Sequence, residues 1–356
     1  MKAKKSIKKI SPYSEGKSSF GKVIKMSSNE TPFGLDASSR KALLECMKTI
    51  NRYPVKEPRA LKEIISKGFN LKYENINLGN GSDELIQFIF MAFIEKNNNV
   101  IIPEATFLMY SIYADIFGVK SIISKMRSKA IDLEDIYNKI NKYTKAVFIA
   151  NPNNPTGLFI KESELIRFIK KVPAHVLIVV DAAYIDFSED NFERSFKNIL
   201  GKGKKNVIFL RTFSKSFGIA GLRIGYSVTD KETCASIEKM RQPFNINSPA
   251  ITLAENILKR KDLVKNRINK ILIERKRMEN FFIKNKIEYL ESHANFICFK
   301  IPKSLLFIEY CKKRGLFIRD LSSFAMKGYM RVTISLKKHN STFRKYLLEF
   351  INNKKR

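Results

Sequence analysis

Short apolar runs rich in Val, Ile and Phe recur through the first two thirds of the chain. Uninterrupted runs of this kind are typical of strands that are buried on both faces of a parallel sheet. The pattern predicts strands at 76–79, 100–102, 146–150, 176–180, 207–210 and 225–228, with helices at 85–95 and 162–171 between some of them. Alternation of strands and helices favours a mainly parallel sheet covered by helices on both faces.

The last third of the chain predicts a second, smaller unit. A long basic helix at 262–284 leads to strands at 295–299, 316–320 and 329–334, and to helices at 305–313 and from about residue 341. We therefore expect an α/β fold with an N-terminal arm at 1–40, a large α/β domain at 41–245, and a connector helix with a small α+β domain at 246–356. Right-handed crossovers in the large domain bring the carboxyl ends of its strands to one edge.

The formal charge of +32, from 66 Lys and Arg against 34 Asp and Glu, is extreme for a chain of 356 residues. Such a charge is compatible with nucleic acid or an anionic membrane as the partner. The basic residues are scattered, however, and no nucleic-acid-binding module is recognisable among them. We therefore interpret the charge as solvated helix faces and expect no specific nucleic-acid partner.

The remaining composition indicates an ordinary globular protein, with 44% hydrophobic residues. The four cysteines and three histidines lie far apart, without the spacing of a zinc site, so we expect reduced cysteines and no metal. No apolar run follows the basic N-terminus as a signal peptide requires, and none reaches the ~18 residues of a membrane span. We expect a cytoplasmic protein with no membrane contact.

The first candidate for chemistry is Lys215, which follows the apolar run at 207–210. Thr212 and Ser214 alternate along the segment before it, so that their hydroxyl groups can point the same way. Arg223 then supplies a guanidinium suited to binding a phosphate through two parallel hydrogen bonds. A lone lysine is usually a solvated surface group. These neighbours favour a phosphate clamp beside an amine.

Polar residues follow three other predicted strands. Ser82 and Asp83 stand where strand 76–79 turns into a helix, whose free N–H groups form an anion site, although both residues could also be plain N-caps. Asp181 ends strand 176–180, and a carboxylate buried there requires a cation. Asn154 lies in a turn made rigid by two prolines and a glycine, which holds its amide in a set position.

Together these motifs resemble those of fold-type I pyridoxal-phosphate aminotransferases, and most closely the histidinol-phosphate aminotransferases. The resemblance rests on the segments 79–84, 151–157 and 212–218, and extends from Tyr13 to Arg331. It implies that Lys215 binds the cofactor covalently and moves the substrate α-proton, with Asp181 and Tyr184 as its catalytic partners. The residues that it implies for binding the cofactor are Ser82, Asp83, Phe107, Asn154, Asp181, Tyr184, Thr212, Ser214, Lys215 and Arg223.

The resemblance further implies the role of each group around the ring. Asp181 keeps the pyridine nitrogen protonated, while Asn154 and Tyr184 hold the ring oxygen. Phe107 corresponds to the ring that stacks on the pyridine, with Tyr110 as the alternative. The family usually has Glu after this Asp, whereas Ala182 stands here.

The substrate and the second subunit are also implied by the resemblance. Tyr13 and Asn29 border the substrate from the N-terminal arm, and Arg319 and Arg331 bind its anionic groups. For arginines in apolar segments, snorkelling to the surface is the ordinary explanation. Tyr53 corresponds to a tyrosine that reaches the cofactor phosphate of the neighbouring subunit, which implies a homodimer with shared active sites.

The expected activity is therefore transfer of the amino group from histidinol phosphate to 2-oxoglutarate, giving imidazole acetol phosphate and glutamate, as a step of histidine biosynthesis. Two other activities on the same fold stay open, namely transamination of aromatic amino acids and decarboxylation of threonine phosphate. A catalytically inactive binding or regulatory protein is a more distant alternative, because Lys215, Asp181, Asn154 and Arg223 occur together.

Overall fold

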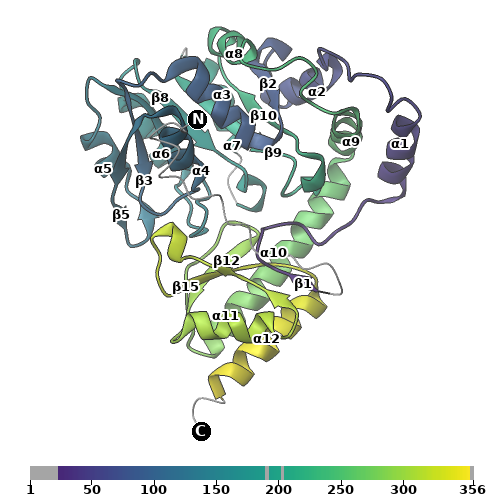
Figure 1. Cartoon of the computed structure of the whole chain (residues 1–356), viewed down its shortest axis with the longest axis vertical. Coiled ribbons are helices and arrows are strands. Elements are labelled where there is room, and N and C mark those ends of the chain that lie inside the picture. The colour runs from purple at the N-terminus through teal and green to yellow at the C-terminus, as the bar shows by residue number, and fades with distance from the viewer. Residues whose placement is uncertain (1–22, 189–191, 202–203, 353–356) are drawn as a thin grey trace, which may run out of the picture.

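The computed structural model describes residues 23–188, 192–201 and 204–352, which build two main sheets (Figure 1). The larger sheet has seven strands in the order β2-β10-β9-β8-β7-β3-β4. Its strands are β2 (Ile76–Gly79), β3 (Asn99–Pro103), β4 (Lys120–Ser124), β7 (Thr144–Ala150), β8 (Leu177–Asp181), β9 (Val207–Thr212) and β10 (Gly225–Val228). Strands β9, β8, β7, β3 and β4 are parallel, whereas β10 is antiparallel to both of its neighbours. The predicted mainly parallel sheet is confirmed.

Alternate side chains of each central strand enter different cores on the two faces of the sheet. In β7, Val147 and Ile149 belong to one core, and Ala146 and Phe148 belong to the other. The first core includes residues of α2 (Arg59–Phe69), α6 (Glu162–Lys171) and α9 (Ser248–Leu258), and the second includes residues of α3 (Gly81–Phe93), α4 (Met109–Phe117) and α8 (Lys231–Glu238). Burial on both faces is why these strands appear in the sequence as continuous apolar runs. The other elements of this region are α1 (Ala37–Met47), β5 (Met126–Arg127), β6 (Ala130–Ile131), α5 (Leu133–Asn138) and α7 (Phe192–Gly201).

The smaller sheet lies at the lower end of the view in Figure 1, and α10 (Lys261–Lys284) runs from the larger sheet toward it. Its four strands are all antiparallel, in the order β11 (Glu288–Tyr289), β12 (Phe296–Lys300), β15 (Tyr329–Thr333) and β14 (Arg319–Asp320). Phe282 of α10 stacks on Phe299 of β12, and Phe343 of α12 (Lys337–Asn352) packs edge-on against both. These rings form much of the core that joins the sheet to α10, α12 and α11 (Ser304–Lys312).

Two expectations for this region were wrong in detail. The predicted strand at 316–320 is divided, because β13 (Leu316–Phe317) pairs with β1 (Ile24–Lys25) and β14 pairs with β15. A chain that changes pairing partner within five residues still reads as one apolar run in the sequence. The last helix begins at Lys337, four residues before the expected start near Ser341, because basic residues at a helix start carry no recognisable N-terminal signal.

Pairing of β1 with β13 ties the segment before residue 40 to the C-terminal part of the chain. The backbone N–H of Ile24 donates to the carbonyl of Gly315 at 2.8 Å, and that of Thr333 donates to the carbonyl of Met26 at 2.9 Å. The division into parts at 1–40, 41–245 and 246–356 stays a prediction. Across the described ranges, no helix combines the length and the apolar character that crossing a membrane demands.

Gly225 is where the larger sheet leaves no room for a side chain. A Cβ atom at this position would lie 2.5 Å from the backbone N of Ser82 and 2.8 Å from the backbone O of Arg211. Both neighbours are backbone atoms, one in the first turn of α3 and the other in β9, so they cannot rotate away as a side chain could.

We expect Gly225→Ala to lower the free energy of unfolding by about 1–3 kcal/mol, as overpacking does elsewhere. Gly68→Ala is the matched control, because a Cβ there meets nothing within 4 Å. That control should raise the stability by about 0.5–1 kcal/mol, the difference between Gly and Ala inside a helix. Urea unfolding midpoints measure both, and equal effects of the two substitutions would contradict the packing described here.

Candidate active site

Two adjoining cavities lie at the carboxyl ends of the parallel strands. The first, here called the sheet-edge cavity, has a volume of about 580 Å³ and is lined by Asp181 at the end of β8 and Thr212 at the end of β9. The second, here called the arm cavity, has a volume of about 240 Å³ and is lined by Lys25 and Glu30 of the N-terminal arm. The residues that line both cavities are Ser28, Glu30, Phe107, Asn154, Tyr184 and Lys215.

Most residues singled out in the sequence meet in these two cavities. The sheet-edge cavity contains Ser82, Asp83, Phe107, Asn154, Asp181, Tyr184, Thr212, Ser214, Lys215 and Arg223. The arm cavity adds Asn29, Arg319 and Arg331. Tyr53 lines neither cavity, is 81% exposed and stacks on Phe244 at 4.9 Å. Tyr13 lies outside the described residues.

Lys215 stands between the two cavities. Its Nζ donates a hydrogen bond to the carbonyl of Ser28 at 3.2 Å and lies 5.6 Å from the centre of the Tyr184 ring. Burial, with the nearby Arg331 guanidinium, lowers the pKa of the Lys215 amine to about 8. A substantial fraction of this amine is therefore neutral near physiological pH, as a nucleophile and proton carrier needs to be.

Asp181 is a buried carboxylate with two fixed donors. Its oxygens accept hydrogen bonds from the Tyr110 hydroxyl at 2.9 Å and from the backbone N–H of Ala183 at 3.1 Å. Burial nevertheless raises the pKa of the Asp181 carboxyl to about 6, although the bond from Tyr110 acts in the opposite direction. A cation in the sheet-edge cavity would stabilise the ionised carboxylate.

The sequence alternatives Phe107 and Tyr110 occupy different places. Phe107 lines both cavities, whereas Tyr110 is fully buried below it, with the rings 5.6 Å apart and nearly perpendicular. The Tyr110 hydroxyl is engaged by Asp181. Only Phe107 therefore presents its ring to a molecule in the cavity, and Tyr110 acts as a partner of Asp181, which the sequence pattern did not suggest.

Asn154 and Tyr184, which line both cavities, are oriented by residues of the N-terminal arm and of the smaller sheet. Arg331 donates to the side-chain oxygen of Asn154 and, at 2.8 Å, to the carbonyl of Ser27. The Nδ2 of Asn29 donates to the Tyr184 hydroxyl at 2.9 Å. The Asn154 amide nitrogen and the Tyr184 O–H are thereby kept as donors for a group in the cavity.

The start of α3 and the Arg223 side chain form a cradle for an anion. Arg223 donates to the Ser214 hydroxyl at 3.3 Å, and its Nη2 lies 2.8 Å from where a Cβ of Gly81 would be. Gly81 has a φ of +79°, which also disfavours a side chain. Ser82 and Asp83 lie inside the first turn, after the N-cap residue Asn80, so the alternative of plain N-caps was wrong.

Asp83 carries an unsatisfied buried atom at this cradle. Its Oδ1 has no hydrogen-bond partner among the described residues, while its Oδ2 accepts from the Tyr113 hydroxyl at 3.3 Å. Burial raises the pKa of the Asp83 carboxyl. An unpaired buried acceptor of this kind needs a hydrogen-bond donor from water or from a bound group.

Sequence reasoning missed an ion pair between a buried arginine and a partly buried aspartate, which lies beside the Lys215 loop. Arg211, 2% exposed, donates from Nη2 to Oδ1 of Asp186 at 2.6 Å, and Ser216 donates to the other oxygen of Asp186. Asp186 follows Tyr184 by two residues and Ser216 follows Lys215, so this contact joins the segment that carries Tyr184 to the loop that carries Lys215. The available signal was Arg211 itself, because a charge at the end of an apolar strand requires a partner.

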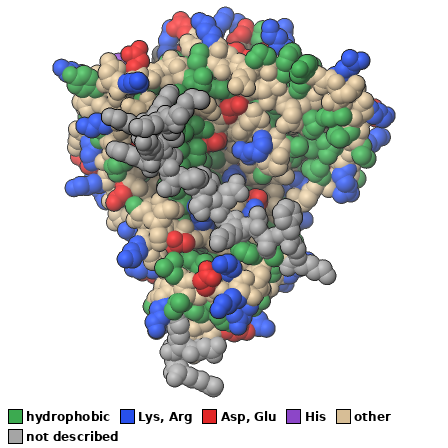
Figure 2. All heavy atoms as spheres, viewed as in Figure 1, with side chains coloured by type: hydrophobic (Ala, Val, Ile, Leu, Met, Phe, Trp, Pro, Cys, Tyr) green, Lys and Arg blue, Asp and Glu red, His purple; other side chains and the backbone are tan. Residues whose placement is uncertain are grey.

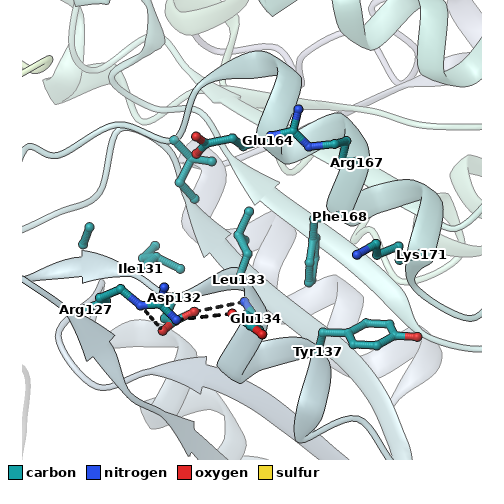
Figure 3. A pocket seen from close by; sticks show the side chains of 12 residues that line it. Arg127, Ile131, Asp132, Leu133, Glu134, Tyr137, Glu164, Arg167, Phe168 and Lys171 are labelled. Carbon is teal, nitrogen blue, oxygen red and sulfur yellow. Dashed lines mark hydrogen bonds and ion pairs between the residues drawn. The ribbon is translucent and has the colours of Figure 1, made fainter.

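A third cavity, of about 650 Å³, lies away from all of these residues, between α5, α6 and the β5–β6 hairpin (Figure 3). Phe168, Leu133 and Ile131 lie among its apolar lining. Arg127 on its rim is paired with Asp132 at 2.9 Å. Of the predicted site residues that the structure describes, none lines this cavity.

The donor set of the sheet-edge cavity fits pyridoxal phosphate. The cradle of hydroxyls, free N–H groups and Arg223 suits its phosphate, and Asp181 suits a protonated ring nitrogen. Among the described residues, Lys215 is the one amine that lines this cavity, and Phe107 offers a ring face.

The pKa of Lys215 is open to a direct test. In cofactor-free protein, we expect carbamylation of Lys215 by cyanate, followed by peptide mass spectrometry, to be half-maximal near pH 8 rather than near the usual ~10.4. Arg331→Gln should move this midpoint to higher pH, because it removes a nearby positive charge that disfavours the protonated amine. Arg314→Gln, an exposed arginine on Tyr310, is the matched control and should leave it unchanged. A midpoint at the usual lysine value would contradict the described burial.

Comparison with known proteins agrees with this geometry. The model of the aminotransferase class I and II family matches residues 21–349. Histidinol-phosphate aminotransferase 1 of Mannheimia succiniciproducens is 34% identical, with 97% of this chain and 97% of that protein covered.

Two solved structures have the same fold. The histidinol-phosphate aminotransferase of Clostridium acetobutylicum is 29% identical with a TM-score of 0.84, covering 93% of this chain and 100% of that one. That of Sinorhizobium meliloti, in complex with pyridoxal-5'-phosphate, is 23% identical with a TM-score of 0.86, covering 93% of this chain and 91% of that one. The predicted fold-type I architecture is confirmed. The chain belongs to the aminotransferase class I and II family, whose enzymes use pyridoxal phosphate as their cofactor.

Proposed function

We propose that the chain is a histidinol-phosphate aminotransferase of histidine biosynthesis, acting in the cytoplasm, with 2-oxoglutarate as the acceptor. The observation that carries this proposal is the arm cavity, where Arg319 and Arg331 line the same space as Lys215. Both arginines are at least nine-tenths buried, so an anionic substrate group would meet them away from water. The names of relatives at about 34% identity support the same activity.

Each residue of the site has a task in this reaction. Pyridoxal phosphate, when bound, supplies a positively charged ring that stabilises negative charge on the substrate α-carbon. Lys215 takes the α-proton and returns a proton, for which its lowered pKa of about 8 is suitable. Asp181 stabilises the protonated ring nitrogen, and Asn154 and Tyr184 donate to the ring oxygen. We assign the phosphate to the N-terminal turn of α3, through the backbone N–H groups at Ser82 and Asp83, and to Thr212, Ser214 and Arg223, and we assign ring stacking to Phe107.

The arm cavity must accept two substrates that differ in their side chains. Histidinol phosphate carries a phosphate and an imidazole, whereas glutamate carries two carboxylates, and both must place an amine beside Lys215. Arg331 is suited to the group that both substrates share, an anion close to the amine. Arg319 and Asn29 stand nearby as further substrate contacts, and Tyr13 keeps this role as a prediction from the sequence.

The activity is tested with purified protein, pyridoxal phosphate and a panel of amino donors. We expect histidinol phosphate to give a kcat/KM at least tenfold above those of phenylalanine and threonine phosphate, with 2-oxoglutarate as the acceptor. Lys215→Ala should abolish turnover, because no other lysine in the part of the chain that the structure describes lines the sheet-edge cavity. A higher kcat/KM for phenylalanine, or release of carbon dioxide from threonine phosphate, would overturn this assignment in favour of the corresponding activity.

The proposed enzyme is a homodimer in which each site uses Tyr53 of the partner. Support comes from exposed apolar side chains on α1 and in the segment that follows it. Leu44, Met47, Ile50, Tyr53 and Val55 are exposed by 71, 48, 51, 81 and 60%. Hydrophobic side chains also gather toward the right of Figure 2, on the side where Figure 1 places α1. An apolar surface of this kind is typical of a subunit interface.

Mixed dimers test the shared site. Tyr53→Ala and Lys215→Ala proteins should each be weakly active or inactive, yet their co-refolded mixture should recover up to about one quarter of wild-type activity, because half of the dimers are hybrids with one intact site. Tyr143→Ala, another exposed tyrosine at 53%, is the matched control and should keep full activity alone. Verified hybrid dimers without recovered activity would exclude a role for Tyr53 across the interface.

A further inference from the structure

Among the described residues, the arm cavity is lined by one carboxylate and several cations. Its charged lining residues are Lys25, Glu30, Lys215, Arg319 and Arg331. Glu30 pairs with Lys25, whose Nζ lies 3.0 Å from Glu30 Oε1. The other oxygen of Glu30 accepts no hydrogen bond from any residue in the described ranges. The other charged residues of this cavity are cations that suit an anionic ligand. The negative charge of Glu30 must therefore serve a different part of the substrate.

The backbone that carries this pair is held firmly. Lys25 lies in β1 opposite Phe317 of β13, and the backbone N–H of Asn29 donates to the Thr333 hydroxyl at 3.0 Å. Asn295 donates to the carbonyl of Asn29 at 3.1 Å. The two charged groups are therefore presented from fixed positions on the cavity wall.

The pair itself is easily separated. The side chains of Lys25 and Glu30 are 32% and 43% exposed. Ion pairs with this degree of exposure contribute little to stability because water screens them, so a ligand that offers a better partner to either group can break the pair. Arg331 differs in this respect, because it is buried and bonded to both Asn154 and Ser27.

The proposed substrates differ at the end that Arg331 does not bind. Histidinol phosphate presents an imidazole ring with an N–H donor at this end, and glutamate presents its side-chain carboxylate. A fixed cation would favour only the carboxylate, and a fixed carboxylate would favour only the imidazole.

We infer that the Lys25–Glu30 ion pair is the specificity determinant that lets one cavity accept both substrates. Glu30 accepts a hydrogen bond from the imidazole N–H of histidinol phosphate, and Lys25 pairs with the side-chain carboxylate of glutamate. The Lys25 ammonium turns toward solvent when histidinol phosphate is bound, and the Glu30 carboxylate turns toward solvent when glutamate is bound. This inference rests on the proposed function, because the proposed reaction is what requires the two different side chains.

The experiment measures binding of two amine-free probes to the holoenzyme by calorimetry. The probes are 3-(imidazol-4-yl)propyl phosphate and glutarate, which keep the two side chains but cannot react. We expect Glu30→Gln to weaken the imidazole probe about tenfold and to leave glutarate unchanged or tighter, since a charged hydrogen bond is lost and a repulsion is removed. Lys25→Met should weaken glutarate about tenfold and leave the imidazole probe unchanged or tighter.

Two further variants serve as controls. Lys25→Arg should restore glutarate binding, because it keeps the positive charge. Glu63→Gln removes a carboxylate from a comparable exposed pair with Arg59, far from the cavity, and should change neither probe. The absorption spectrum of the bound cofactor reports whether each variant is folded.

The outcomes separate this inference from the proposed function. If the wild-type enzyme acts on histidinol phosphate but both variants weaken both probes equally, or neither variant changes binding, the ion pair is not the determinant. If the wild-type enzyme does not act on histidinol phosphate at all, the proposed function fails and the inference fails with it.

Discussion

Burial of two groups that prefer water, the Asp181 carboxylate and the Lys215 amine, is the constraint on which the site depends. Burial moves their pKa values in opposite directions, to about 6 and about 8. The parallel pairing of β8 with β9 makes this arrangement possible, because Asp181 lies opposite Leu210, five residues before Lys215. The cost of burying each group is offset by the hydrogen bonds from Tyr110 and Ala183 and by the bond to the Ser28 carbonyl.

A third buried charged group, the Arg211 guanidinium, supports the first two. Arg211, in β9, donates to Asp186 in the segment after β8, and Ser216, in the loop after β9, donates to the same carboxylate. Breaking such a pair leaves an uncompensated buried charge, which typically costs about 3–5 kcal/mol. The position of Lys215 relative to Tyr184 therefore depends on residues that touch neither cavity.

Much of this architecture could be predicted from the sequence. Continuous apolar runs identified the central strands, because both faces of the sheet are covered. The positions of Asp181, Asn154 and Lys215 after those runs predicted their convergence, since parallel strands end at one edge. Side-chain partners could not be predicted in the same way. The pairing of Arg331 with Asn154 spans 177 residues, and the division between β13 and β14 depends on β1, which is distant in sequence. No local pattern records contacts of this range.

The attachment of the arm to the C-terminal sheet determines the order in which the site is assembled during synthesis. Asn29 and Thr333, which hydrogen-bond to each other, are separated by 304 positions in the sequence. The strands of the larger sheet are complete at Val228, so this sheet can form while the ribosome is still adding the remaining residues. The arm cavity closes only after Thr333 has emerged, and closing so long a loop is an entropically unfavourable, late step. A nascent chain therefore has synthesised the residues of the cradle at α3 and Arg223 before the arm cavity can close.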